Sequence, residues 1–193
     1  MQYHYTILPQ NHPHVMRPCA KCSTMKPFVP TDQFRINAQK KLLDVWLIYQ
    51  CIDCGHTWNL TLFERISPKQ LDRALYDRLL SNDAALIEQY AFDVQLHANR
   101  HAPLCYDALR YEIEGETPAM DTPCELIFDC SVPLGIKASK LIREVLQLSG
   151  AQFDALTQQN ALRSLDGKPL RKRKMTTHLH IQFDPPCIIP PVE

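Results

Sequence analysis

The feature that most constrains the fold of this chain is a pair of cysteine motifs, each with two residues between its cysteines. The first motif, CAKC, contains Cys19 and Cys22, and the second, CIDC, contains Cys51 and Cys54, with 28 residues between the motifs. Two intervening residues let a tight turn aim both sulfurs at one ion, and a β-hairpin between the motifs can bring two such turns together. Gly55 follows the second motif, where the backbone often needs a positive φ angle. We therefore predict a zinc ribbon in which these four cysteines hold one structural Zn²⁺.

Four thiolates fill the coordination shell of such an ion, so the predicted site has no open position for water and does not catalyse. Its metal would instead contribute folding free energy to a small subdomain. The alternative is two pairs of buried thiols without a metal, which would make the matching spacing of the two motifs a coincidence.

Composition gives little information about partners. The chain has 193 residues, a formal net charge of zero and 45% hydrophobic residues, which is typical of a soluble protein of one or two domains. Its first residues lack the basic start and apolar run of a signal peptide. No stretch approaches the roughly 18 to 20 apolar residues that span a bilayer. We expect a cytoplasmic protein with no membrane partner and with reduced thiols.

Charge is unevenly distributed along the chain. Residues 107–129 contain seven acids and one base, a net charge of −6, whereas residues 137–174 contain nine bases and three acids, a net charge of +6. Such segregation suggests that the basic segment has its own partner. A solvated basic surface, or one that binds the acidic segment, is the alternative.

The residue pattern predicts an α+β chain in five consecutive segments. They are the zinc ribbon at 1–66, an αα-hairpin at 67–102, an acidic strand and linker region at 103–135, a small basic α/β module at 136–184, and an extended proline-rich tail at 185–193. Runs rich in β-branched and aromatic residues predict strands at 3–8, 33–38, 42–51, 59–66, 106–113 and 124–130. Ser67 and Gln70 predict a capping box at the start of the hairpin, and its second helix is expected to run to about Ala98.

A second metal site is the less favoured interpretation of the remaining histidines and cysteines. His97 and His101 are four residues apart on the predicted helix, where their side chains share a face. Cys105, Cys124 and Cys130 could in principle join them, but Pro103 ends the helix before Cys105. Buried cysteines and exposed histidines are the expected alternative, and the same applies to His4, His12, His14 and Cys187.

The basic module is predicted to contain two short helices and a small sheet. Ser149 caps the second helix, with Gln152 at the capping-box position, and Asn160 can take the left-handed conformation that ends it. A strand at 162–165, a tight turn at Asp166-Gly167, a basic strand and a last strand at 178–183 are expected to follow.

This order of elements resembles the RNA-binding domain named after ribosomal protein S-four, whose pattern reads R-L-D-x-x-L, then S-R, then G-x-V-x-V-N-G-K. Lys137 stands where the first arginine would be, Ser149 follows twelve residues later, and SLDGKPL at 164–170 stands for the V-N-G stretch. The chain departs from the pattern at Ser139, in place of the aspartate, and at Gly150, in place of the second arginine. The resemblance implies a module that binds structured RNA.

Physical reasoning supports the same partner, because clustered lysines and arginines attract phosphates and give salt-dependent binding. A helix-rich basic module suits recognition of structured RNA by shape and backbone contact. The candidate RNA-binding residues are Lys137, Lys140, Arg143, Arg163, Lys168, Arg171, Lys172, Arg173 and Lys174.

The whole chain is also similar to an uncharacterised bacterial family, a domain of unknown function of about this length. The first cysteine motif, the stretch FRINAQKKLLDVWLIYQC, and the continuation CGHTWNLTLFER after Asp53 carry this resemblance. It implies a small cytosolic zinc-ribbon protein, and it implies no activity.

Three function classes follow from these features. The favoured one is a non-enzymatic RNA-binding accessory protein that acts on ribosomes or transfer RNA. The second is a zinc-ribbon adaptor that contacts proteins or the transcription machinery without RNA binding. An enzyme is the least favoured, because the sequence contains no phosphate loop, no nucleophile elbow and no convincing Cys-His pair.

Overall fold

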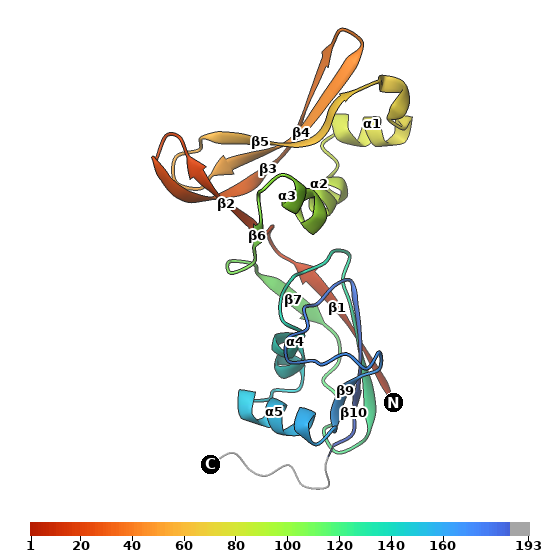
Figure 1. Ribbon diagram of the computed structural model, residues 1–193. Helices are drawn as coiled ribbons and strands as arrows, with labels where there is room; N and C mark the ends of the chain where they lie inside the picture. The colour runs from red at the N-terminus through yellow and green to blue at the C-terminus, as the bar shows by residue number, and fades with distance from the viewer. Residues whose placement is uncertain (186–193) are drawn as a thin grey trace. The chain divides into compact units, whose positions relative to one another are not determined.

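The computed structural model describes residues 1–185, and the chain forms two compact units (Figure 1). One unit combines Met1–Gln10 with the chain from Arg110 onward, and the other is Asn11–Leu109. The predicted tail at 185–193, apart from its first residue, lies outside the described residues, and so does Cys187. No helix within residues 1–185 is long and apolar enough to cross a membrane.

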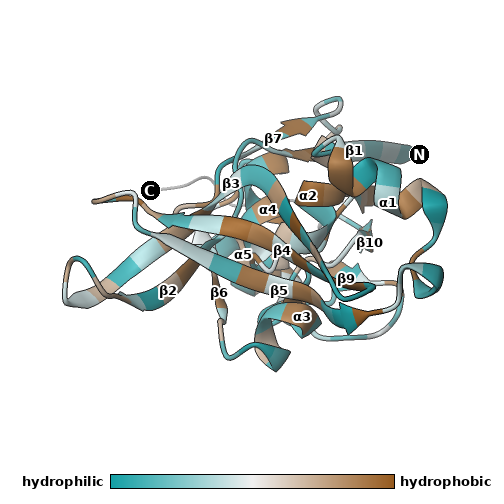
Figure 2. Cartoon of the chain, turned by 90° about the horizontal axis from the view of Figure 1, so that it is seen from above, coloured by the Kyte–Doolittle hydropathy of each residue, from teal (hydrophilic) through white to brown (hydrophobic). Residues whose placement is uncertain are grey.

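The unit Asn11–Leu109 is built on an antiparallel sheet with the strand order β5-β4-β3-β2-β6. Its strands are β2 (His14–Cys19), β3 (Thr24–Gln39), β4 (Leu42–Cys51), β5 (Thr57–Ile66) and β6 (Leu104–Cys105). Burial alternates along most of β4, which gives that strand one fully buried face. Hydrophobic and hydrophilic stretches are visible along these strands in Figure 2. The predicted strands at 33–38, 42–51 and 59–66 are therefore confirmed.

A two-residue turn joins β3 and β4. Gln39 pairs with Leu42, and the intervening Lys40 and Lys41 have φ angles of +50° and +66°. Positive φ at both central positions is the geometry of a type I′ hairpin turn, in which Asn-Gly is the preferred pair.

Three short helices follow the sheet, where sequence reasoning predicted two. A 3₁₀ turn (Pro68–Gln70) leads into α1 (Arg73–Leu80), and α2 (Ala84–Ala91) and α3 (Val94–Asn99) come next. The Ser67–Gln70 capping box is present. The second predicted helix, which was expected to reach Ala98, is instead broken at Phe92 and Asp93. Asp93 accepts a hydrogen bond from the backbone of Leu96 and so begins a new helix.

These helices and the cysteine motifs share one core. Cys19 and Cys51 are buried in a cluster with Tyr49 from β4 and Ile87 from α2, and Leu96 of α3 packs against the same cluster. The helices therefore pack on the ribbon sheet, a point that the sequence left open.

The other unit is a five-stranded mixed sheet with the order β7-β1-β8-β10-β9. Its strands are β1 (Gln2–Pro9), β7 (Tyr111–Glu114), β8 (Cys124–Asp129), β9 (Leu162–Ser164) and β10 (His178–Phe183). β1 lies parallel to β8 and antiparallel to β7. The predicted strand at 3–8 therefore forms, but it pairs with strands from the acidic region and does not join the ribbon sheet. The predicted strand at 106–113 is shorter and begins at Tyr111.

Helices α4 (Ala138–Val145) and α5 (Gly150–Gln158) lie on one side of this sheet in Figure 1. Helix residues that include Leu141 and Phe153 are buried, and so is a row of side chains on the strands. The predicted Ser149–Gln152 capping box is present, and Asn160 has a φ of +56°.

The predicted basic strand after Asp166-Gly167 is not formed. Between β9 and β10 the chain makes turns and a single bridge, in which Lys174 pairs with Lys137. Arg173 explains this path, because its guanidinium binds Asp166 and the hydroxyl of Ser164, at 2.5 and 2.6 Å. These contacts fold the segment back on its own turn, so it does not extend along the sheet.

Candidate metal centre and basic surface

Two similar turns present the four cysteines. The backbone N–H of Ser23 donates to the carbonyl of Cys19 at 2.8 Å, and that of Gly55 donates to Cys51 at 2.9 Å. Ser23 and Gly55 have φ angles of +56° and +70°, which confirms the positive φ expected after the second motif. Each turn thus directs its two cysteines to the same point.

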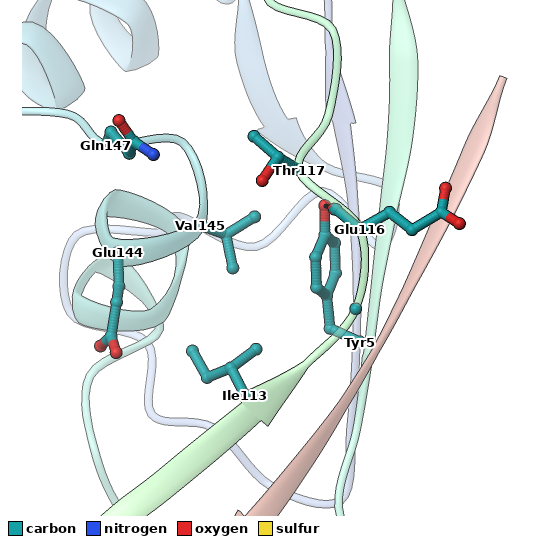
Figure 3. A pocket seen from close by; sticks show the side chains of 8 residues that line it. Tyr5, Ile113, Glu116, Thr117, Glu144, Val145 and Gln147 are labelled. Atoms are coloured by element: carbon teal, nitrogen blue, oxygen red, sulfur yellow. Dashed lines mark hydrogen bonds between the residues drawn. The ribbon is translucent and has the colours of Figure 1, made fainter.

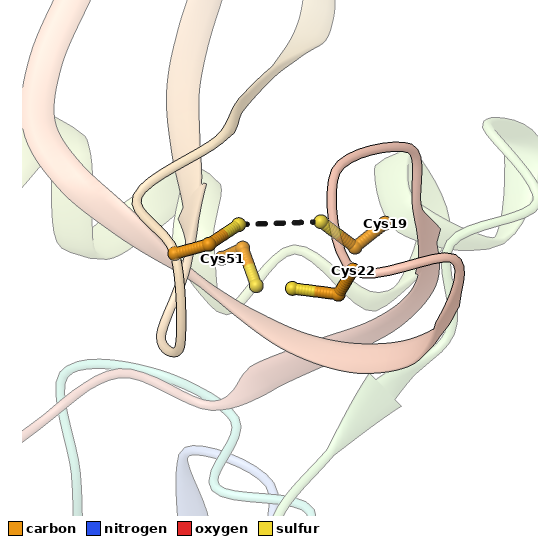
Figure 4. A group of neighbouring side chains, drawn as sticks. Cys19, Cys22 and Cys51 are labelled. Carbon is orange, nitrogen blue, oxygen red and sulfur yellow. Dashed lines mark hydrogen bonds between the residues drawn. The ribbon is translucent and has the colours of Figure 1, made fainter.

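The four sulfurs converge, and those of Cys19, Cys22 and Cys51 face one another in Figure 4. All four ligand atoms lie within 4.8 Å of one another, and the sulfurs of Cys19 and Cys54 are 3.5 Å apart. A tetrahedral ion with metal–sulfur bonds of about 2.3 Å would hold its sulfurs about 3.8 Å apart. All four thiols are free of disulfides. The cluster is therefore compatible with a metal ion.

The close thiols shift one another's pKa values in opposite directions. Hydrogen bonds from the other thiols, Cys54 first, together with burial raise the pKa of Cys22 to about 12. Burial also disfavours the thiolate of Cys19, but hydrogen bonds led by the Cys22 backbone outweigh it and lower the pKa of Cys19 to about 7. Four thiolates at this spacing repel one another unless a cation is bound among them.

Aromatic and charged side chains surround the cysteines. The Trp58 ring lies 5.3 Å from that of Tyr49, and the Arg17 guanidinium lies 4.0 Å from the Trp58 ring centre. Lys26 and Asp53 form an ion pair at 2.5 Å. Trp58 is partly buried and packs against the core cluster that contains Cys19 and Cys51.

The second metal site considered for His97, His101 and the cysteines Cys105, Cys124 and Cys130 does not form within residues 1–185. His97 is buried, but it lies next to Tyr49 and not in the helix-surface pair with His101 that the spacing suggested. Cys124 and Cys130 are buried in the other unit. The four-cysteine group alone brings three or more such ligands together among the described residues.

The structure brings part of the candidate RNA-binding set together. Lys137 and Lys174 are 37 positions apart in the sequence, but they pair across the antiparallel bridge. The backbone N–H of Ala138 donates to the carbonyl of Arg173 at 2.9 Å, which fixes the same junction. Lys137 is the N-cap of α4 and makes no side-chain cap hydrogen bond there.

A second basic group lines a cavity of about 330 Å³ beside β9. Its side chains already have acidic neighbours. Arg163 binds Asp184 at 2.6 Å, Arg171 lies 3.5 Å from Asp154, and Lys168 lies 3.6 Å from its own neighbour Asp166. This group is less available to a phosphate than the Lys137–Lys174 junction.

Of the four remaining candidates, Lys172 is exposed and the other three make contacts within the unit. Arg173 binds Asp166, and this hydrogen bond is the main reason why the pKa of that carboxyl lies well below its usual range. Arg143 donates to the carbonyl of Leu148 at 3.2 Å. Lys140 lies 5.0 Å from the centre of the Tyr111 ring.

Another cavity of the same unit, shown in Figure 3, has a volume of about 210 Å³, and Tyr5, Ile113, Glu144 and Val145 are among the residues that line it. The Tyr5 hydroxyl donates to the carbonyl of Glu116 at 2.9 Å. None of the candidate basic residues is among those that line this cavity.

Sequence reasoning missed a cavity of about 400 Å³ in the ribbon unit. Its lining includes His12, Asp32 and Glu88, with 3.8 Å between His12 Nδ1 and an oxygen of Asp32. No spacing rule could have found it, because a bulge in β3 and the start of α2 create it.

Comparison with known proteins gives a family without an assigned activity. The family model described as "Protein of unknown function (DUF1062)" matches residues 36–168, more than half of the chain, and this match begins after the first cysteine motif. No curated protein and no solved structure matches the chain significantly. The sequence-based resemblance to an uncharacterised domain family is thereby confirmed, and the chain belongs to the DUF1062 family of proteins of unknown function.

Proposed function

We propose that this protein is a non-enzymatic, cytoplasmic RNA-binding accessory factor of the ribosome or of transfer RNA, with a zinc ribbon as a structural part. The observation that carries this proposal is the bridge between Lys137 and Lys174. It joins two basic segments that are distant in sequence, at the start of helix α4.

Availability of charge favours this junction as the phosphate contact. Lys137, Lys172 and Lys174 are exposed, and none of the three has an ion pair with a described residue. The positive end of the helix dipole at the start of α4 adds to their attraction for phosphate. The expected binding is to the nucleic-acid backbone and is sensitive to salt.

Acidic side chains disfavour one face of this sheet as the RNA-binding surface. Register places Glu112 and Glu114 of β7 and Glu125 and Asp129 of β8 on the sheet face away from the helices. Such a face repels phosphate, unlike the aromatic sheet faces that stack bases in other RNA-binding modules. Contact through the lysine junction, by shape and backbone, is therefore favoured over reading of bases.

Several elements agree with the S-four resemblance. The two short helices, the Ser149 cap, the left-handed Asn160 and the antiparallel β9–β10 pair all occur in the expected order. The departures are the irregular segment at 168–177 and the pairing of β10 with β8.

Zn²⁺ is the metal we propose for the four cysteines. Thiolate-only tetrahedral sites favour zinc or iron, and zinc is the usual ion of a closed structural site. The buried positions of Cys19 and Cys51 in the core of the ribbon unit support a structural role for the ion.

A protein-binding adaptor is the second candidate function, and an apolar cluster beside the cysteines favours it. Met16 pairs with Pro27 and Pro18 pairs with Met25 across β2 and β3, while Ile52 follows Cys51. The exposed fractions of Met16, Met25 and Ile52 are 39%, 55% and 52%, and a group of exposed apolar side chains is typical of a protein-binding surface.

Fluorescence anisotropy with transfer RNA and with ribosomal RNA fragments tests the proposal. Changing Lys137, Lys172 and Lys174 to Ala should weaken binding and should lower the slope of log K against log salt by about 2 to 3. The control is Lys21, Lys40 and Lys41 changed to Ala, which removes the same charge from the ribbon unit. Equal losses in both variants, or no salt-dependent RNA binding by the wild type, would reject the proposal and favour the adaptor.

A further inference from the structure

The open face of the β7-β1-β8-β10-β9 sheet carries two adjacent histidine–carboxylate pairs. His178 Nδ1 lies 2.7 Å from an oxygen of Asp129, and His180 Nε2 lies 2.8 Å from an oxygen of Glu125. Both histidines come from β10 and both carboxylates come from the neighbouring strand β8. The RNA-binding proposal uses none of these four residues.

Strand geometry places the two imidazoles together. They are two residues apart on β10, so their side chains project from the same face of the sheet. Their ring centres are 6.2 Å apart, with an angle of 78° between the ring planes. The side chains are 58% and 30% exposed, so an ion from solution can reach both.

Each carboxylate engages one ring nitrogen and leaves the other free. The pair with Asp129 uses Nδ1 of His178, and the pair with Glu125 uses Nε2 of His180. Nε2 of His178 and Nδ1 of His180 have no hydrogen-bond partner among residues 1–185. A carboxylate on one nitrogen is the arrangement that orients a metal-binding histidine and raises its basicity.

The separation of the rings suits one shared ion. Metal–nitrogen bonds of about 2.0–2.1 Å allow the centres of two rings that bind the same ion to be at most about 6.4 Å apart. The observed 6.2 Å lies just below this limit, which corresponds to two nitrogens on nearly opposite sides of the ion. Glu125 is held in turn by the Gln2 amide, which donates to its Oε2 at 2.9 Å, so the support of His180 extends to a third strand.

We propose that His178 and His180 form a binding site for a divalent transition-metal ion, with Asp129 and Glu125 as positioning residues. Imidazole nitrogens favour copper, nickel and zinc, whereas the four thiolates of the ribbon unit favour zinc or iron. Solvent and exposed carboxylate oxygens would complete the coordination shell. The two sites therefore belong to different units and differ in ligand chemistry.

The test uses the full chain with its cysteine centre loaded with zinc. Ni²⁺ is titrated at pH 7.5 by isothermal calorimetry, and one site per chain is expected in the wild type. His178→Ala, His180→Ala and the double variant should each weaken the binding at least about tenfold. His4→Ala is the matched control, because His4 is an exposed histidine of the same sheet face on β1.

Separate variants test the positioning residues. Asp129→Asn and Glu125→Gln should weaken Ni²⁺ binding about tenfold to a hundredfold while the histidines remain. Electron paramagnetic resonance of one Cu²⁺ per wild-type chain provides a readout that does not depend on how variants fold. It should show hyperfine coupling to two imidazole nitrogens.

The proposal would be overturned by wild-type Ni²⁺ affinity in the His178→Ala/His180→Ala double variant, by no Ni²⁺ binding to the wild type, or by a Cu²⁺ spectrum with fewer than two imidazole nitrogens. Loss of binding in His4→Ala equal to that in the double variant would also reject it, because it would indicate nonspecific surface histidines.

Discussion

The hydroxyl of Tyr49 lies 3.3 Å from Nε2 of His97, and both residues are fully buried. This contact joins strand β4 to helix α3. Tyr49 lies two residues before Cys51, the first cysteine of the second motif. Two polar groups are thus satisfied by each other in the core where the helices meet the ribbon sheet.

Tyr49→Phe should destabilise the ribbon unit by about 1 to 3 kcal/mol, because it leaves a buried nitrogen of His97 without its partner. Tyr106→Phe provides the matched control, since the hydroxyl of Tyr106 is buried with no hydrogen-bond partner among the described residues. Its removal should be neutral or stabilising. Urea unfolding of the zinc-loaded variants measures both effects, and equal losses would contradict this assignment.

His97 should also make stability depend on pH. Burial lowers the pKa of His97 below its usual value of 6.5, so the unfolded chain takes up a proton at a higher pH than the folded chain. The contribution is therefore present above about pH 6.5 and is lost as the pH falls from there toward the lower, folded-state pKa. The measurement is the difference in unfolding free energy between wild type and His97→Gln at pH 7.5 and pH 6.0. A difference that does not shrink on acidification would contradict the prediction.

Metal removal should unfold the ribbon unit selectively. Cys51→Ser removes a buried ligand that also belongs to the core, so the variant should lose its bound metal and most of the cooperative unfolding of residues 11–109. Cys105→Ser should keep one metal per chain, because Cys105 lies outside the cysteine cluster. Elemental analysis and hydrogen exchange measure these outcomes. Full protection of this unit in Cys51→Ser would show that the metal is dispensable.

Sequence reasoning predicted the local features that depend on a few neighbouring residues. The two cysteine turns, the capping boxes at Ser67 and Ser149 and the left-handed Asn160 all depend on short-range chemistry, and all are present.

Features that depend on contacts distant in sequence could not be predicted in the same way. Nothing within β1 shows that it pairs with β8, more than 120 residues away. The irregular path at 168–177 depends on three side chains, Ser164, Asp166 and Arg173, which meet only after folding. The candidate basic set therefore did not separate the lysine junction from the residues that have internal partners.

The Lys40-Lys41 turn gives the last prediction. Both lysines have positive φ angles, at +50° and +66°, a conformation that disfavours residues with a Cβ atom. Replacing them with Asn-Gly keeps the two-residue loop and the Gln39–Leu42 pair, so it should raise stability by about 1 kcal/mol or more. Urea unfolding of the zinc-loaded protein measures the gain, and Lys40→Ala/Lys41→Ala is the control that removes the same charge while it retains the strained backbone. A gain in the control equal to that of Asn-Gly would assign the effect to charge and would contradict the backbone explanation.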